Sequence, residues 1–351
     1  MRTVRRSTPL LAVLGALVLA PAAANAAEVP ASTTPATTTP AAPAPAAGSV
    51  KLTLQRVGGR PLFATVGQRF VVRGVVIPYV AGQTVAVSFY LGGRKVAVKT
   101  VAVVPVGNGA GQFHLGYSSS QAGSLQMRAD HYATAQQAAF SGRSVKLEVA
   151  HTNLGPGSAG SSVRLLQSEL ASLRYAVPVN GVYDEATEQA VIAFRKMTGQ
   201  ERIGYSGARV FKLLQGGAGA FPVRYRRDGR HVEANLTKQV LAEIEPGGRV
   251  YRIYTTSSGK PSTPTVIGRF TVYLKTPGTN SEGMVDSNYF IRGYAIHGYA
   301  EVPTYAASHG CLRVPIPDAP AIYGWVREGT PVDVYNEYGG GSARVRSNAG
   351  P

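Results

Sequence analysis

The chemistry that this sequence could perform centres on its one cysteine, Cys311, and on two of its six histidines, His297 and His309, which shortly precede it. A cysteine attacks as the thiolate, but a free thiol with a pKa of about 8.5 is only a few per cent ionised at neutral pH. A neighbouring imidazole can accept the thiol proton. These residue types therefore indicate nucleophilic catalysis on a carbonyl group, with a histidine as general base.

Spacing alone does not decide which histidine is the base. His309 stands two residues before Cys311, whereas His297 stands fourteen residues before it. Residues two apart on an extended segment share a face with roughly parallel side chains, so a direct hydrogen bond from an opposing strand is more natural. We therefore favour His297 as the base and expect His309 to organise the loop around the cysteine.

The residues next to Cys311 add features that acyl chemistry uses. Gly310 permits the close approach of a substrate carbonyl, and the N–H groups around Gly310 and Cys311 can form an oxyanion hole. Arg313 can stabilise the developing oxyanion or hold a substrate carboxylate. A zinc site made of His297, His309 and Cys311 is the alternative, but this spacing is uncommon and a hydrolytic zinc site usually adds a carboxylate base. We expect no metal and no cofactor.

The first residues predict export. Arg2, Arg5 and Arg6 precede an apolar run over residues 10–20, and small residues follow up to Ala26, which is the pattern of a secretory signal peptide over residues 1–26. The run is shorter than the roughly 20 apolar residues that a transmembrane helix needs. A lone cysteine in an exported protein cannot form an internal disulfide, so it is either buried and inert or has a function.

The charge balance narrows the class of partner. Lys and Arg number 36 against 19 Asp and Glu, a formal net charge of +17. For an exported protein the natural partners are anionic, such as peptidoglycan carboxylates, other anionic wall polymers or a membrane surface. Nucleic acid is the usual inference from such a charge, but export and the scattered positions of the arginines argue against it.

Periodicity divides the rest of the chain into a linker, three folded units and a tail. Residues 27–49 are rich in Ala, Thr and Pro and cannot bury a core. Residues 50–151 contain about seven short alternating runs between glycine turns, which predict an immunoglobulin-like β-sandwich acting as a spacer or adhesion module. Residues 154–215 switch to helical periodicity and predict a bundle of three helices, with caps at Ser161 or Ser162 for the first and at Asp184 for the second.

Residues 221–336 predict a mainly β domain that carries Cys311 and both histidines. Its β-like runs cover residues 240–244, 250–254, 270–274, 294–296 and 331–335, and residues 319–327 are the one helix-like stretch. Residues 337–351 are expected to be a disordered tail.

The helical unit resembles the peptidoglycan-binding domain that accompanies many wall enzymes. The matching residues are Val163, Leu166-Gln167, Leu170, Val177-Pro178, Asn180-Gly181-Val182-Tyr183, Thr187, Ala190-Val191 and Phe194. The resemblance implies binding to peptidoglycan stem peptides or glycan, and the alternative is a purely structural helical spacer.

The C-terminal unit resembles the L,D-transpeptidase catalytic domain, which has the YkuD-type fold. The matching motifs are Ile296-His297-Gly298 and Ser308-His309-Gly310-Cys311 with Arg313, and an earlier similarity covers Thr263-Pro264-Thr265, Gly268 and Phe270-Thr271-Val272. The resemblance spans roughly residues 232–335. It implies that Cys311 is the nucleophile, that His297 is its base, and that Ser308, His309, Gly310 and Arg313 shape the substrate and oxyanion site.

The resemblance also implies a reaction. Cys311 would attack the carbonyl between the third residue of a stem tetrapeptide and its terminal D-alanine, and an amine of a second stem would resolve the thioester to give a 3-3 cross-link. Water in place of the amine would make an L,D-carboxypeptidase. NlpC-type endopeptidases place cysteine before histidine and sortases carry Thr-x-Thr-Cys, and neither pattern is present. A non-catalytic wall-binding protein is the remaining alternative, and it would not need the thiol.

Overall fold

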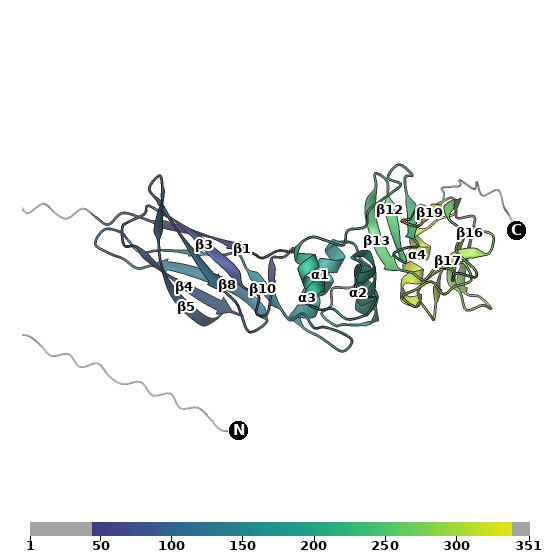
Figure 1. Cartoon of the computed structure of the whole chain (residues 1–351), viewed down its shortest axis with the longest axis horizontal. Helices are drawn as coiled ribbons and strands as arrows, with labels where there is room; N and C mark the ends of the chain where they lie inside the picture. Colours follow the sequence, from purple (N-terminus) through teal and green to yellow (C-terminus); the bar gives the residue numbers. More distant parts are fainter. Residues whose placement is uncertain (1–43, 339–351) are drawn as a thin grey trace, which may run out of the picture. The chain divides into compact units, whose positions relative to one another are not determined.

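The computed structural model describes residues 44–338. The predicted signal peptide, most of the predicted linker and all but the start of the predicted tail lie outside these residues. The described part begins with a β-sheet region, continues with three helices and ends in a β-rich domain, as the sequence predicts (Figure 1). Between residues 44 and 338, no helix has both the length and the apolar character required to cross a membrane.

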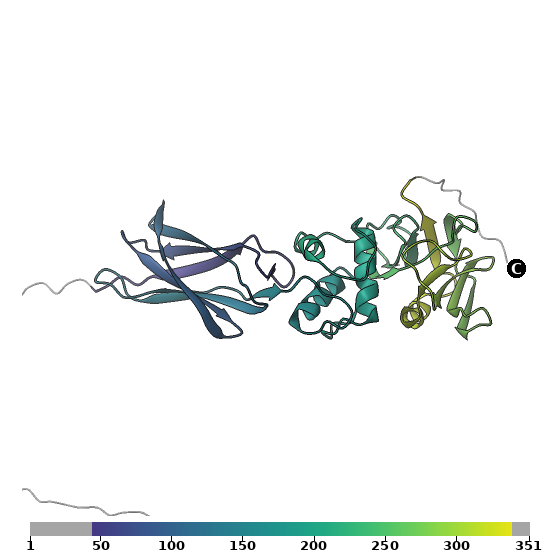
Figure 2. The same cartoon turned by 60° about the horizontal axis from the view of Figure 1, so that its bottom comes forward.

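The N-terminal region consists of two sheets that share one core (Figure 2). One sheet has the strand order β1-β3-β7-β6, and the other has the order β2-β10-β8-β4-β5 with β9 paired to β8. The bounds are β1 (Ser49–Gln55), β2 (Phe63–Thr65), β3 (Phe70–Ile77), β4 (Thr84–Leu91), β5 (Arg94–Ala102), β6 (Val104–Gly107), β7 (Ala110–Tyr117), β8 (Gly123–His131), β9 (Phe140–Arg143) and β10 (Leu147–Ala150).

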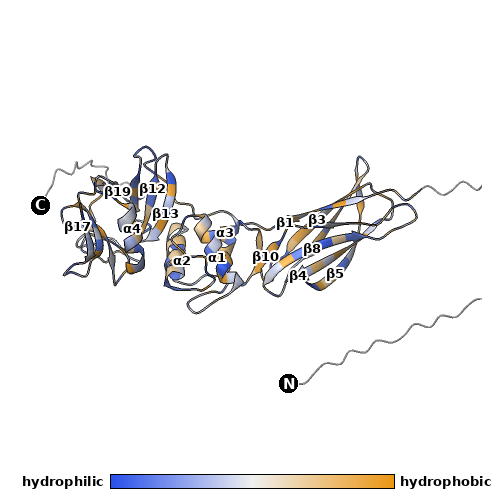
Figure 3. Ribbon diagram, turned by 180° about the vertical axis from the view of Figure 1, so that it is seen from behind, coloured by the Kyte–Doolittle hydropathy of each residue, from blue (hydrophilic) through white to orange (hydrophobic). Residues whose placement is uncertain are grey.

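Alternating side chains build this core, so the prediction of a β-sandwich is confirmed. Hydrophobic and hydrophilic residues alternate along the strands (Figure 3), and Val72, Phe113, Val87 and Met127 from the two sheets are all fully buried. The predicted runs coincide with seven of the strands, although the last run begins two residues before β10. The three further strands, β2, β6 and β9, have only three or four residues each, too few to show a period.

The helical region contains α1 (Ser161–Ser172), α2 (Glu185–Met197) and α3 (Ala208–Gln215). Asp184 caps α2 as predicted, because its side chain accepts a hydrogen bond from the Thr187 N–H at 2.9 Å. The predicted serine cap of α1 is wrong. Gly160 is the N-cap, and the Ser162 hydroxyl instead accepts a hydrogen bond from the His151 N–H at 3.0 Å.

Gln167 holds α1 to the loop that leads into α2. This side chain is fully buried, and its amide nitrogen donates to Asn180 Oδ1, the Val182 carbonyl and Thr187 Oγ1 at 2.8 to 2.9 Å. Its amide oxygen accepts the Gly181 N–H at 2.7 Å. A glutamine with all its hydrogen-bonding groups in use fixes one path for this loop.

The C-terminal domain contains two further sheets, ordered β13-β12-β11-β19-β14 and β15-β16-β17-β18. Their strands are β11 (His231–Asn235), β12 (Val240–Glu245), β13 (Arg249–Thr255), β14 (Gly268–Thr271), β15 (Leu274–Thr279), β16 (Val285–Ile291), β17 (Tyr294–Tyr299), β18 (Leu312–Pro315) and β19 (Pro331–Tyr335). The predicted helix is α4 (Ala319–Trp325), which follows the 3-10 turn η1 (Ile316–Asp318). The predicted single run over residues 270–274 is divided between β14 and β15.

The helices bury apolar residues against both neighbouring regions. Their core continues into the C-terminal domain through Val240 and Ile253 of β12 and β13, and into the sandwich through Phe63 of β2. The rings of Phe63 and Phe211 meet edge to face, with centroids 5.9 Å apart. The helical region therefore shares a hydrophobic core with the strands on each side.

Candidate active site

Two neighbouring strands bring the predicted catalytic residues together. β17 and β18 run parallel, with His297 opposite Arg313 and Ile296 opposite Leu312. Cys311 directly precedes β18. The register places the side chains of Arg313 and His297 on one face of the sheet, and Cys311 stands two residues before Arg313 in sequence.

The Cys311 side chain is partly buried. Its thiol donates a hydrogen bond to the Gly293 carbonyl, with Sγ and O 3.7 Å apart. Burial raises the pKa of the thiol, and the Ala295 N–H and the charge of Arg313 oppose this shift only in part. The resting cysteine at neutral pH is therefore the thiol, which needs a base when it attacks.

The His297 ring can act as that base. The side chain is 2% exposed, and burial, with Arg313 as a second cause, lowers the pKa of the imidazole to about 4. Nδ1 lies 2.9 Å from the Gly298 carbonyl. Because a carbonyl only accepts, Nδ1 carries the proton of the neutral ring and Nε2 keeps its lone pair.

Ser308 closes the turn that presents the cysteine. Its hydroxyl donates to the Cys311 carbonyl at 2.6 Å and accepts the Gly310 N–H at 3.0 Å. Gly310 has a φ of +123°, and a Cβ atom there would lie 2.2 Å from Cε1 of Tyr294. The turn therefore requires glycine for two reasons, its backbone conformation and the ring that packs against it.

Thr263 and Thr265, which belong to the earlier motif, hold this turn from the outside. Thr263 Oγ1 donates to the Ser308 carbonyl at 3.1 Å, and Thr265 Oγ1 donates to the Gly310 carbonyl at 2.8 Å. Thr265 also accepts the Gly259 N–H at 2.8 Å. These two threonines thus brace the turn that carries Cys311, and the motif continues into β14, which begins at Gly268.

His309 faces a different way from His297. It is exposed, and its Nε2 lies 3.3 Å from Lys260 Nζ. Among residues 44–338, no three His, Cys, Asp or Glu side chains are grouped so that they would hold a metal ion. His309 is therefore an exposed side chain beside Lys260, whereas the His297 ring is buried.

The residue that sequence reasoning missed is Tyr299, which links His297 to Arg313. Its ring meets the His297 ring edge to face at 5.6 Å, and the Arg313 guanidinium carbon lies 4.0 Å from its centroid. The contact fixes where the Arg313 charge lies. The signal available in the sequence was an aromatic residue two positions after His297, on the same face of the strand.

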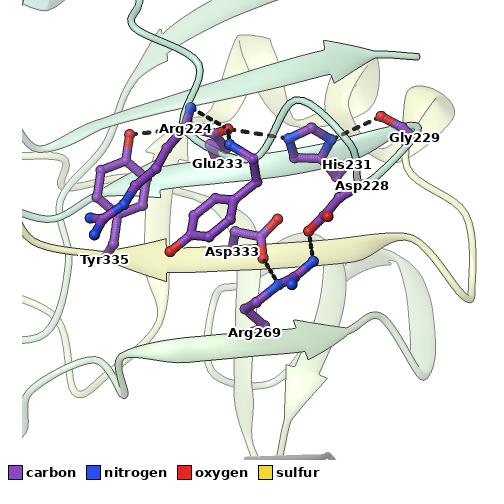
Figure 4. A network of polar contacts seen from close by, with 9 residues as sticks. Arg224, Asp228, Gly229, His231, Glu233, Arg269, Asp333 and Tyr335 are labelled. Atoms are coloured by element: carbon purple, nitrogen blue, oxygen red, sulfur yellow. Dashed lines mark hydrogen bonds and ion pairs between the residues drawn. The ribbon is translucent and has the colours of Figure 1, made fainter. Parts of the chain in front are cut away.

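A second group of polar side chains lies elsewhere, on the five-stranded sheet (Figure 4): His231 and Glu233 on β11, Arg269 on β14, and Asp333 and Tyr335 on β19. All of them except Arg269 are buried. Glu233 accepts hydrogen bonds from the His231 ring and the Tyr335 hydroxyl, both at 3.2 Å, and from the Arg224 N–H. Arg269 pairs with Asp333 and with Asp228.

This network attaches the segment that enters the catalytic domain. Both nitrogens of the His231 ring face acceptors, the Gly229 carbonyl at 2.9 Å and Glu233. Burial lowers the pKa of His231, but the hydrogen bonds to Glu233 and Gly229 outweigh it and the pKa is raised. Most of these groups pair with one another, although Asp333 Oδ2 has no hydrogen-bond partner among residues 44–338, and the network holds residues 224–229 on the sheet.

Comparisons with known proteins agree with the motifs. Residues 229–334 match the L,D-transpeptidase catalytic domain family, and residues 159–214 match a peptidoglycan binding domain family. No curated protein matches the chain in a sequence comparison.

Solved structures of L,D-transpeptidases are among those similar to parts of this chain. An L,D-transpeptidase of Xylanimonas cellulosilytica is 36% identical over 52% of this chain and 98% of that one, with a TM-score of 0.49. An L,D-transpeptidase of Stackebrandtia nassauensis is 24% identical over 54% and 98%, with a TM-score of 0.35. One of Mycobacterium smegmatis is 12% identical over 82% and 99%, with a TM-score of 0.27. On the family matches and the 36% identity, the chain belongs to the L,D-transpeptidase family, with a peptidoglycan-binding domain before its catalytic domain.

Proposed function

We propose that this chain forms 3-3 cross-links between peptidoglycan stem peptides through a thioester on Cys311. The observation that carries the proposal is the state of His297. Its Nδ1 proton is committed to the Gly298 carbonyl, and its pKa of about 4 keeps the ring neutral. A neutral imidazole on the strand next to the thiol is the base that a protonated cysteine requires.

The acylation step follows from these protonation states. Sγ of Cys311 attacks the carbonyl that joins the third stem residue to D-alanine while Nε2 of His297 takes the thiol proton. The Cys311 N–H stabilises the oxyanion, because the Gly310 N–H already donates to Ser308. Collapse breaks the peptide bond, and His297 returns the proton to the leaving amine of D-alanine.

The second step regenerates the thiol. The amine on the third residue of another stem attacks the thioester carbonyl, His297 accepts a proton from that amine, and the thiolate leaves as the new amide forms. The proton then returns to Cys311. Arg313, held against Tyr299, supplies a fixed positive charge for a stem carboxylate. Ser308 and His309 keep the turn in place, and no cofactor enters either step.

The peptidoglycan-binding domain would hold the enzyme on its polymer, and the basic charge would favour anionic wall components. We propose that the signal peptide over residues 1–26 exports the chain, so that it acts outside the cytoplasm. We also propose the remaining domain division. It consists of a linker over residues 27–49, a sandwich over 50–151, a helical domain over 154–215 and a catalytic domain over 221–336.

The test is mass spectrometry of products and protein after incubation with a disaccharide-tetrapeptide. The wild type should yield a cross-linked dimer that has lost one D-alanine, with a transient thioester adduct, and Cys311→Ala should yield neither. Tripeptide alone, even with excess acceptor, would show an L,D-carboxypeptidase instead. Products that do not depend on the thiol, or no product with wall binding intact, would contradict the proposal and favour a binding protein.

A further inference from the structure

Lys196 is a buried basic residue that the proposed reaction does not use. It lies on α2 of the peptidoglycan-binding domain and is 2% exposed. Its ammonium group donates to three acceptors of the catalytic domain: the Gln239 carbonyl at 3.1 Å, the Thr255 hydroxyl at 2.6 Å and the Thr256 carbonyl at 3.0 Å. A lysine has three donors, so this contact uses all of them.

The surroundings of Lys196 make it a costly residue for stability alone. All three acceptors are uncharged, and burial, with Arg202 as a second cause, lowers the pKa of Lys196 to about 7. A buried charge is generally no more stabilising than a well-packed apolar side chain of similar size. Its distinct contribution here is geometric, since it fixes α2 against the ends of β12 and β13.

A chain of hydrogen bonds runs from this contact to the catalytic turn. The Gln239 side chain donates to Ser258 Oγ at 2.6 Å and accepts the Ser258 N–H at 2.8 Å. The Ser258 carbonyl accepts the N–H groups of Ala307 at 2.8 Å and Ser308 at 2.9 Å. Ser308 in turn closes the turn at Cys311. Two residues, Gln239 and Ser258, therefore connect Lys196 to Ser308, the serine that closes the turn at Cys311.

Thr256 gives a second and shorter connection. Its carbonyl accepts from Lys196, and its hydroxyl donates to the Arg313 carbonyl at 2.8 Å.

Arg202, also from the helical domain, donates to the Thr304 carbonyl at 2.7 Å and to the Thr237 carbonyl at 3.0 Å. It thereby attaches the loop between His297 and Ser308 to the hairpin that carries Gln239.

We propose that Lys196 and Arg202 are positioning residues through which the peptidoglycan-binding domain holds the catalytic turn of its neighbour in the reactive conformation. The binding domain is then a structural part of the active site as well as an anchor on the wall. The kinetic test of this inference rests on the proposed function, because it measures cross-linking. The alkylation test does not, because it measures only the reactivity of the Cys311 thiol.

The experiment compares full-length wild type with Lys196→Met, Arg202→Gln and Lys212→Met. Lys212 is an exposed lysine on α3 of the same domain and serves as the matched control. Three quantities are measured: kcat and KM for cross-linking, co-sedimentation with purified sacculi, and the rate at which iodoacetamide alkylates Cys311, followed by intact mass.

We expect Lys196→Met to lower kcat by about 100-fold, the loss that a small misplacement of reacting groups produces, with KM and sacculus binding unchanged. The alkylation rate should change in Lys196→Met and Arg202→Gln but not in Lys212→Met. Wild-type kcat and alkylation rates in both test variants would overturn the proposal, as would a loss of activity that only followed lost sacculus binding.

Two controls keep the outcome decisive. If Lys196→Met does not fold, Arg202→Gln decides, because its side chain lies nearer the surface and its loss leaves the Lys196 contact in place. If the wild type forms no cross-link, the proposed function fails, but the alkylation rates still report whether the binding domain positions the turn. An unchanged rate in Arg202→Gln would then count against the positioning role.

Discussion

Replacement of Gly310 by alanine should separate the conformation of the catalytic turn from its chemistry. Alanine at a φ of +123° is strained by about 1–3 kcal/mol. The added Cβ would also lie 2.2 Å from Cε1 of Tyr294, with two further ring atoms at 2.7 Å, and such overpacking costs about 1–3 kcal/mol more. Together these effects should lower the free energy of unfolding of the catalytic domain by about 2–6 kcal/mol.

The chain has one tryptophan, Trp325, and it reports on this domain. It is 6% exposed on α4, and its indole N–H donates to Glu245 at 3.1 Å, so its fluorescence should follow unfolding in denaturant. Gly324→Ala is the matched control, because a Cβ at this helical position meets nothing within 4 Å. It should leave stability unchanged or raise it by up to about 1 kcal/mol.

A double variant distinguishes the two causes. Removal of the ring in Tyr294→Ala should relieve the steric conflict, so that Gly310→Ala costs only the backbone strain of about 1–3 kcal/mol in that background. Thioester formation should fall in Gly310→Ala, since the turn that aims the thiol is displaced. If Gly310→Ala matches Gly324→Ala in stability and forms the thioester at the wild-type rate, the reasoning about this turn is wrong.

Three further predictions concern protonation and packing. The rate of thioester formation should have its acidic limb near pH 4, the pKa of His297, and a limb near 6.5 would contradict the buried, neutral base. Burial raises the pKa of Glu243 to about 8 despite the Tyr254 hydrogen bond. Between pH 4.5 and 8 the folded state therefore retains a proton that the unfolded state has lost, so the free energy of unfolding should fall as the pH rises through this range. Glu243→Gln should remove that slope and gain a few kcal/mol at high pH in denaturant titrations. Gln167→Ala should destabilise the helical domain by about 1–3 kcal/mol, measured by circular dichroism, because it leaves the buried Gly181 N–H without its partner.

The sequence predicted strands well where one face is apolar and the other polar. It missed β11, whose five residues are all buried although His231, Glu233 and Asn235 are polar. These side chains avoid the usual cost of burial because other polar groups satisfy them, as Figure 4 shows for His231 and Glu233. Such partners come from distant strands: β11 pairs in parallel with β19, and local periodicity contains no information on that pairing.

The same limit applies to the site. Cys311 and His297 could be named as candidates because a lone cysteine with a nearby upstream histidine is typical of a nucleophile and its base, and the structure places His297 on β17 and Cys311 directly before the parallel strand β18. Tyr299, Ser258 and Gln239 were not identifiable, since each is an ordinary polar or aromatic residue until the fold gives it partners. Whether His297 is the base remains a prediction for the pH profile.

Phe63 joins the N-terminal sandwich to the helical domain, so the sandwich cannot be replaced by another module without loss of contacts. It belongs to the sandwich by chain order, yet its ring packs on Phe211 and its carbonyl accepts from Gln215 at 2.9 Å. An engineered enzyme with a different N-terminal module would expose Phe211 to water unless the new module supplied an aromatic residue at this position. Because the helical domain also shares its core with Val240 and Ile253 of the C-terminal domain, the three units are best transplanted together, with the chain cut before the sandwich rather than between units.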